Sequence, residues 1–282
     1  MRLPRSPSLS VALVLLLLGP GTALCQETAI TRYLHPWGRF QEGAWKRYRD
    51  VTETLDERGV VTNLSVTETK TTLQKVERDG VTLLVEAVVD IAGKQLSTQP
   101  RTVKQGFHGE QANQKSVLRD LGTNQLTIEG RVIPCRVEQV EVADNASKTV
   151  TKTYYSPTVA PFVLRRESIV SDLEGTTKLS ETTLEVVALH VPCKILSRLR
   201  SAAHVKAVTN HPKGTTTTWA YTSIDVPGGV LCQTAEERDE KHRLVRKSTL
   251  ELIDYGFTPE QEHPGLFNRV RGRHRAHRSA VR

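Results

Sequence analysis

The sequence of 282 residues predicts an all-β protein with only minor helix, built on one large antiparallel sheet that curls into a half-open barrel. Three observations predict this fold class. β-Branched residues occur in short alternating runs, turn signals recur at the spacing of a many-stranded β domain, and segments of the sequence are repeated at long intervals.

The clearest alternating run is VTLLVEAVVDI at residues 81–91. Its apolar residues of one parity would share one face of a strand, whereas Thr82, Glu86 and Asp90 keep the other face partly polar. Asp79-Gly80 precedes the run and indicates a hairpin. Further turn signals follow along the chain: Glu57-Arg58-Gly59, Asp144-Asn145, Glu174-Gly175, Pro212-Lys213-Gly214 and Pro227-Gly228-Gly229.

Helix is expected in only two places. One is a short piece within residues 27–40, and the other is QKSVLRDL at residues 114–121. Gly122 follows the second segment directly and would cap the end of that helix.

Two short segments recur in the sequence. SETTLEVV at residues 180–187 is similar to RKSTLELI at 246–253 and to TKTTLQKV at 69–76, and VPCK at 191–194 is similar to IPCR at 133–136. A repeat of this length predicts a unit of about four strands that shares its core with its neighbours. Behind a leader, the chain divides into an N-terminal segment (26–43), a β domain (44–257) of three units (about 44–125, 126–190 and 191–257) and a basic, unstructured tail (258–282).

Residues 1–25 have the pattern of a secretory signal peptide. Arg2 and Arg5 precede an apolar run at residues 11–18 that is shorter than the ~20 residues of a membrane anchor. Cleavage after Cys25 would release a periplasmic or extracellular protein. Lipidation of Cys25 is the alternative, but Leu24 is bulky for that processing site.

The net charge of +8 lies at the two ends of the chain. Residues 1–25 contribute +2 and residues 263–282 contribute +6, so the part between them is formally neutral. The basic character is therefore no evidence that the folded part binds nucleic acid. The tail carries the arginines that we expect to contact an anionic surface, with a solvated terminus as the alternative: Arg269, Arg271, Arg273, Arg275 and Arg278.

Three cysteines follow the leader. In an exported chain we expect a disulfide between Cys193 and Cys232, with pairing of Cys135 and Cys193 as the second choice. His190 stands three residues before Cys193, and Cys232 or His242 could complete a metal site, but a single pair at this spacing is a weak signal. We expect no metal and no cofactor.

No common catalytic motif occurs in the chain. Gly-x-Ser-x-Gly, His-Glu-x-x-His and phosphate-binding glycine loops are absent from the sequence. Glu185 and Glu251 occupy matching repeat positions, which is typical of solvent-facing strand residues. The sequence therefore predicts a protein that is not an enzyme, although a hydrolase with unmarked carboxylates stays an alternative.

Aromatic residues gather in HPWGRFQEGAWKRY at residues 35–48. Trp37, Phe40, Trp45 and Tyr48 could line a ligand opening. Such a cluster more often fixes an N-terminal segment to the sheet, because aromatic side chains bury a large area.

The segment HPWGRFQEGAWKRYRDVTETLD at residues 35–56, with the Thr-rich strands after it, resembles exported proteins of planctomycete-type bacteria that carry no assigned activity. The expected curled sheet is more distantly similar to the periplasmic lipoprotein-carrier half-barrels. That resemblance implies acyl chains held on a concave face, and it is architectural only.

Three hypotheses about function follow. The leading one is a non-catalytic exported protein that binds a hydrophobic molecule, such as a lipid, or an envelope component on its sheet. It requires a concave apolar surface. The second is a structural protein held to an anionic surface by residues 263–282, and the third is a hydrolase, which requires two carboxylates, or a Ser or Cys beside a His, at catalytic distance.

Overall fold

The computed structural model describes residues 32–91, 93–108 and 115–258. These residues form a fourteen-stranded antiparallel sheet that is curled and not closed, which confirms the predicted all-β class. Within these ranges there is no helix, and so no helix of the length and apolarity needed to cross a membrane. The leader and the arginines of the tail lie outside the described residues.

The strands are long and follow one another along the chain. They are β1 Trp45–Leu55, β2 Val61–Val76, β3 Gly80–Ile91, β4 Lys94–Ser97, β5 Arg101–Gly106, β6 Lys115–Ile128, β7 Arg131–Ala143, β8 Lys148–Tyr155, β9 Val163–Ser171, β10 Lys178–Ile195, β11 Arg198–His211, β12 Gly214–Thr222, β13 Val230–Asp239 and β14 Leu244–Gly256.

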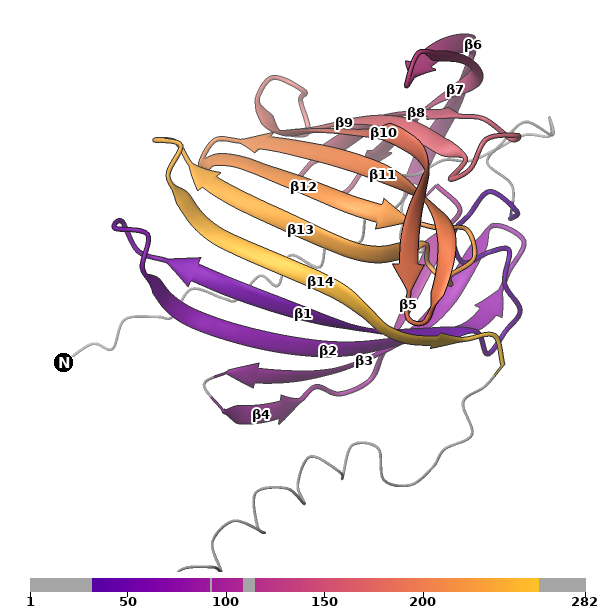
Figure 1. Ribbon diagram of the computed structural model, residues 1–282. Coiled ribbons are helices and arrows are strands. Elements are labelled where there is room, and N and C mark those ends of the chain that lie inside the picture. The colour runs from indigo at the N-terminus through magenta and orange to yellow at the C-terminus, as the bar shows by residue number, and fades with distance from the viewer. Residues whose placement is uncertain (1–31, 92, 109–114, 259–282) are drawn as a thin grey trace, which may run out of the picture.

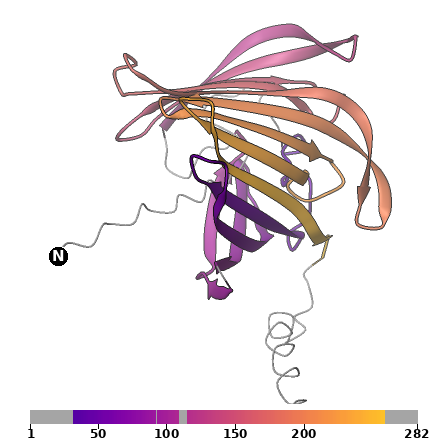
Figure 2. The ribbon, with the colours of Figure 1, turned by 60° about the vertical axis from the view of Figure 1, so that its left-hand side comes forward.

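The sheet has the order β4-β3-β2-β1-β14-β13-β12-β11-β10-β9-β8-β7-β6, and β5 pairs with β3 beside β4. Most neighbours are joined by hairpins, whereas β1 pairs with β14 and so joins the first and last strands in the middle of the sheet. Figures 1 and 2 show the sheet curled about a trough, with β1 to β5 on one side and β6 to β11 on the other. The face toward the trough is called the inner face below.

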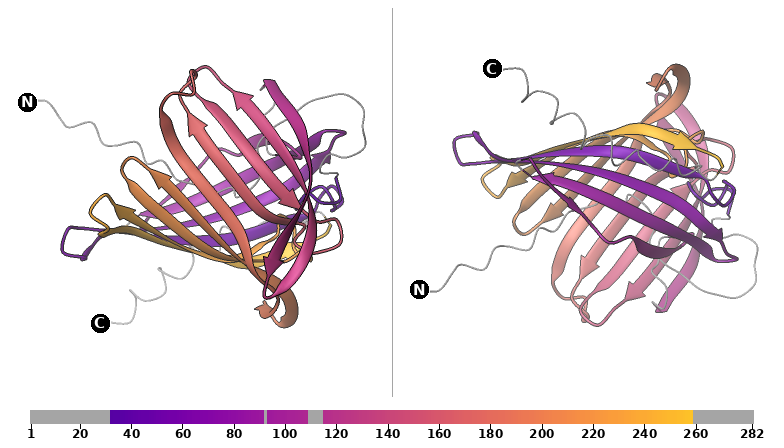
Figure 3. Two further views of the ribbon diagram at one scale, coloured as in Figure 1. Left: turned by 90° about the horizontal axis from the view of Figure 1, so that it is seen from above. Right: turned by 90° about the horizontal axis from the view of Figure 1, so that it is seen from below.

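Residues 32–43 cover one end of the trough and contact both sides of it (Figure 3). Trp37 packs with Leu73 and Leu83 of the β1 to β5 side. On the other side, Gly228 in the loop between β12 and β13 donates its N–H to the carbonyl of Pro36 at 3.1 Å. Gly228 has φ of +71°, and a Cβ there would lie 2.8 Å from the Trp37 ring, so only glycine fits this contact.

The β6–β7 hairpin folds over the inner face at the same end. Ile128 and Ile133 pack against Leu164 in one core cluster with side chains of β10 and β11. The turn residue Glu129 accepts a hydrogen bond from the backbone N–H of Leu189 at 2.7 Å. Because β10 has a bulge at this point, the carboxylate satisfies a donor that the strand ladder leaves free.

The predicted helix at residues 114–121 is wrong, because β6 begins at Lys115 and continues to Ile128. Gly122, read as a helix cap, has φ of +82° and lies at a register shift between Asp120 and Thr123. A glycine with positive φ serves a bulge as well as a cap. Of the other predicted helical piece, the described residues 32–40 form turns.

The predicted disulfide is not formed in the structure, where Cys135, Cys193 and Cys232 are free thiols. β11 and β12 lie between β10 and β13, yet Cys193 and Cys232 lie close enough for Cys193 to raise the pKa of Cys232. Cys193 packs near the end of the curled β10–β11 hairpin, and burial raises the pKa of each of the three thiols.

The repeated sequence segments lie in β2, β7, β10 and β14. The loop between β8 and β9 also matches the loop between β12 and β13. Ser156 donates its N–H to the carbonyl of Phe162 at 2.8 Å, and Ser223 donates to Gly229 at 2.7 Å at the same place in the second loop. The predicted boundary between the second and third units, at residues 190 and 191, lies inside β10, which continues to Ile195. The boundaries of the units stay a prediction.

Leu73 and Leu250 occupy matching positions in the repeat, yet Leu73 is fully buried and Leu250 is only partly buried. We expect Leu73→Ala to lower the free energy of unfolding by about 2–5 kcal/mol, because it leaves a cavity in the cluster that holds Trp37. Leu250→Ala should cost clearly less. Urea unfolding of both variants measures the difference, and equal losses would contradict the assigned core.

Candidate functional site

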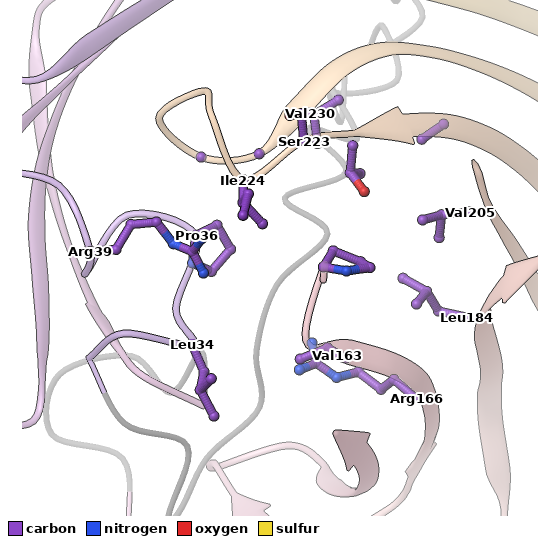
Figure 4. A pocket seen from close by; sticks show the side chains of 15 residues that line it. Leu34, Pro36, Arg39, Val163, Arg166, Leu184, Val205, Ser223, Ile224 and Val230 are labelled. Carbon is purple, nitrogen blue, oxygen red and sulfur yellow. The ribbon is translucent and has the colours of Figure 1, made fainter. Parts of the chain in front are cut away.

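An apolar pocket lies on the inner face of β9 to β12, at the covered end of the trough (Figure 4). The strands contribute Leu184 and Val205, the N-terminal segment contributes Leu34 and Pro36, and the loop after β12 contributes Ile224. The pocket has a volume of about 80 Å³ and is open to solvent on one side. Carbon atoms make up most of its wall.

The strand register explains why the pocket forms here. Val205 on β11 lies opposite Ala220 on β12, and one step along the strands Leu184 lies between Arg166 on β9 and Ala207 on β11. Side chains that lie opposite each other or two residues apart share one face of a sheet. Small residues at Ala207 and Ala220 therefore leave space beside the larger Leu184 and Val205.

Beyond the row of Arg166, Leu184 and Ala207, the inner face becomes polar. Ser168, Thr182, Thr209 and Thr216 form the next row on β9 to β12, and the hydroxyls of Thr182 and Thr209 are 2.9 Å apart. The trough is thus apolar at its covered end and hydroxyl-lined farther along. Arg166 lies at the boundary between the two parts.

Arg166 is the cationic group on the sheet wall of the pocket. Its Nε donates to the hydroxyl of Thr153 on β8 at 3.3 Å. Among the ion pairs of the described residues none includes Arg166, and burial lowers its pKa to about 10. A guanidinium with this pKa keeps its charge at neutral pH, so the apolar pocket has a positive group at its edge.

Arg39 lies on the opposite wall and has several partners. Its Nη2 donates to the carbonyl of Tyr33 at 2.8 Å, and its guanidinium lies 4.6 Å from the centre of the Phe162 ring. Burial lowers the pKa of Arg39, and the nearby Asp225 acts in the opposite direction.

A buried polar layer lies behind Arg166 where the two sides of the sheet approach each other. The hydroxyl of Tyr155 donates to Glu138 Oε1 at 2.8 Å, and His108 Nδ1 is 3.8 Å from Glu138 Oε2. Burial raises the pKa of Tyr155 well above its usual value. Burial, with the charge of Arg166 as the second cause, lowers the pKa of His108 to about 4, so its imidazole is neutral at pH 7.

His35 belongs to the same region and is fully buried. Its Nδ1 accepts hydrogen bonds from the backbone N–H groups of Trp37 at 3.2 Å and Gly38 at 3.1 Å, which holds residues 35–38 in a tight turn. Burial is the main cause that lowers its pKa to about 3, and the charge of Arg166 adds to it. His35 is therefore a structural residue that is neutral at physiological pH.

A second hollow of about 230 Å³ lies next to the pocket, and Pro161 and Ile224 are part of both walls. In it, Nδ1 of His190 is 3.3 Å from the hydroxyl of Ser201. Both side chains are exposed. Within the described part of the chain no hydrogen bond or ion pair joins His190 to a carboxylate, so the pair lacks the third group that orients a catalytic histidine.

The four aromatic residues singled out in the sequence lie outside the pocket wall described here. Trp37 and Phe40 belong to the core cluster around Leu73, and Trp45 and Tyr48 are buried on β1. Lys46 Nζ lies 5.7 Å from the centre of the Trp37 ring and 5.6 Å from that of Tyr48, and burial lowers its pKa to about 8. These contacts attach the N-terminal segment to the sheet.

Arg166 was not among the residues predicted from the sequence. A signal for it exists in VLRRESIVS at residues 163–171, because neighbouring residues of a strand point to opposite faces. Of Arg165 and Arg166, one had to point to the inner face. The wall residues from the N-terminal segment and the β12–β13 loop carry no such signal. In the described ranges, no group of three or more His, Cys, Asp or Glu side chains is arranged to hold a metal ion.

No protein-family model and no curated protein matches the sequence. Among solved structures, a protein of Bacteroides fragilis with a YmcC-like fold, provisionally assigned as exported, is 12% identical with a TM-score of 0.30, over 76% of this chain and 97% of that one. A protein of Parabacteroides distasonis, provisionally assigned as a lipoprotein, is 12% identical with a TM-score of 0.32, over 79% and 98%.

Neither structure comes from a planctomycete-type bacterium, so that finer resemblance stays a prediction. At these TM-scores and identities the two structures indicate no activity for the chain.

The neutral state of His35 predicts a pH-dependent stability. The unfolded chain takes up a proton near pH 6.5, whereas folded His35 stays neutral down to about pH 3. The contribution of His35 to the free energy of unfolding is therefore complete above pH 6.5 and is lost as the pH falls toward 3. Between pH 7.5 and 5, the titration of His35 should lower the free energy of unfolding of the wild type by about 2 kcal/mol. His35→Asn should not show this part of the decrease.

Urea unfolding at the two pH values measures this loss. The asparagine side chain offers an oxygen near the position of Nδ1, so the turn at residues 35–38 can be kept. His242→Asn changes an exposed histidine and is the matched control. Equal pH dependence in wild type and His35→Asn would show that His35 is not buried in its neutral form.

Proposed function

We propose that this protein is a non-catalytic exported β protein that binds a hydrophobic molecule in the pocket on the inner face of its sheet. The observation that supports this most strongly is the apolar wall formed by Leu184, Val205 and Ile224 under the cover of residues 34–39. Apolar surface kept accessible at the end of a trough is typical of a ligand site rather than of a packed core.

The trough favours an elongated ligand. The pocket itself accommodates only a small apolar group, whereas the row of Ala207, Thr218, Ala235 and Ser248 continues from Leu184 across the sheet with small side chains. Ala207, Thr218 and Ala235 are buried in the structure, so a chain anchored in the pocket would have to displace the side chains that cover this row.

The alternative hydrolase function has one specific feature in its favour, the contact between His190 and Ser201. We prefer the binding function because both residues are exposed and no acid orients the imidazole among the described contacts. Hydrolysis of p-nitrophenyl butyrate that is lost in Ser201→Ala would reverse this preference. The hypothesis of attachment to an anionic surface rests on the tail arginines, which lie outside the described residues.

Binding of the neutral fluorescent probe N-phenyl-1-naphthylamine tests the proposed site. Leu184→Gln should weaken probe binding by about tenfold, because an amide in the apolar wall loses its hydrogen bonds to water when the probe covers it. Ile169→Gln is the matched control, since Ile169 is an exposed residue of β9 on the outer face. Unfolding midpoints first confirm that both variants are folded.

Unchanged probe affinity in folded Leu184→Gln, or an equal loss in Ile169→Gln, would contradict the assigned pocket. Native mass spectrometry of the protein purified from its own host gives an independent measurement. A co-purifying amphiphile that is displaced by the probe is expected.

A further inference from the structure

Arg166 is held in place by the sheet at the edge of the pocket. It lies in β9 between Thr153 of β8 and Leu184 of β10, and Figure 4 shows its side chain beside Val163 at the pocket. The hydrogen bond from Nε to Thr153 fixes one side of the guanidinium. Its remaining N–H donors have no side-chain or carbonyl acceptor among the described residues.

The contrast with Arg165 identifies Arg166 as the unusual arginine of this strand. Arg165, on the outer face, forms an ion pair with Glu167 at 2.6 Å. Arg166 is partly buried and has no ion pair within the described ranges. The carboxylate of Glu138 lies two strands away, with Oε1 bound to the hydroxyl of Tyr155.

Partial burial weakens the hydration of a guanidinium, so an anion bound beside it would offset part of this cost. The planar fork of arginine matches the two oxygens of one carboxylate and forms charge-assisted hydrogen bonds with it. A phosphate monoester would bring a second negative charge. Arg39 is less able to bind this second charge, because it already donates to the carbonyl of Tyr33, stacks on the Phe162 ring and interacts with the carboxylate of Asp225.

The position of Arg166 also sets the orientation of a ligand. Toward the covered end lie the apolar side chains of Leu184, Val205 and Ala220, and in the other direction lie the hydroxyls of Thr182 and its neighbours. An amphiphile that follows this division places its head at Arg166 and its chain in the pocket. Because the pocket is only about 80 Å³, it holds only part of one chain, and the rest of the chain would lie beyond the pocket.

We infer that the ligand is a long-chain carboxylate, such as a fatty acid, whose carboxylate pairs with Arg166 while its chain contacts Leu184 and Val205. This inference rests on the proposed function and adds the chemical class of the ligand to it.

Competition with N-phenyl-1-naphthylamine tests the inference in the folded protein. Oleate should displace the probe at a concentration at least about tenfold lower than oleyl alcohol, which has the same chain without the charge. Arg166→Gln should weaken oleate by about tenfold or more and leave oleyl alcohol and the probe unchanged. Arg165→Gln changes the neighbouring arginine on the opposite face and should bind all three as the wild type does.

The outcomes separate the two proposals. Equal affinity of the wild type for oleate and oleyl alcohol, or unchanged oleate binding in Arg166→Gln, overturns the inference but leaves a hydrophobic site in place. Tighter binding of dodecyl phosphate than of dodecanoate also overturns it. Absence of binding for the probe and both oleyl compounds contradicts the proposed function itself. The comparison of ligands on the wild type decides the question even if Arg166→Gln fails to fold.

Discussion

The short connection between β5 and β6 is the constraint on which the shape of the molecule depends. These two strands follow each other in the chain but lie at opposite edges of the sheet, because β1 pairs with β14 in the middle. Laid flat, the strands from β5 to β6 would span about 58 Å at about 4.8 Å per strand. The chain from Gly106 to Lys115 reaches about 30 Å at most. The sheet therefore has to curl until its edges approach.

The curl explains why the site lies where it does. Where the edges approach, side chains from both sides of the sheet meet in one buried layer that contains His108, Glu138 and Tyr155. Residues 32–43 contact both sides and cover that end, so the apolar surface on β9 to β12 is enclosed only there. Among the described residues nothing comparable covers the open end, and its inner face carries hydroxyl groups instead. The strand order thus determines which end of the trough is covered, and the apolar side chains lie at that end.

Much of the fold was predictable from the sequence, because alternation and turn residues depend on local geometry. The run at residues 81–91 became β3, and Asp79-Gly80 stands at the turn before it. Gly122 was misread because positive φ serves a helix cap and a bulge equally. Cys193 and Cys232 lie near each other in the structure, but both are free thiols, and no local sequence pattern shows whether two nearby thiols are joined. The pocket combines Leu34, Leu184 and Ile224, whose proximity results from the curl.

The electrostatics of the buried layer bear on why one arginine would carry the recognition. Burial alone accounts for most of the lowered pKa of His35 and His108, and the charge of Arg166 lowers both further. Both imidazoles are consequently neutral at pH 7 and add no positive charge to the pocket. Among the described residues of the pocket wall, Arg166 and Arg39 are left as the cationic groups; Asp225 acts on Arg39, and Glu138 lies in the buried layer two strands from Arg166. An anion placed at Arg166 would remove part of the repulsion that the two histidines experience and would raise their pKa values. Ligand charge and the protonation of the buried layer are therefore coupled, because Arg166 adds to the lowering of both histidine pKa values and is the group that a carboxylate would neutralise.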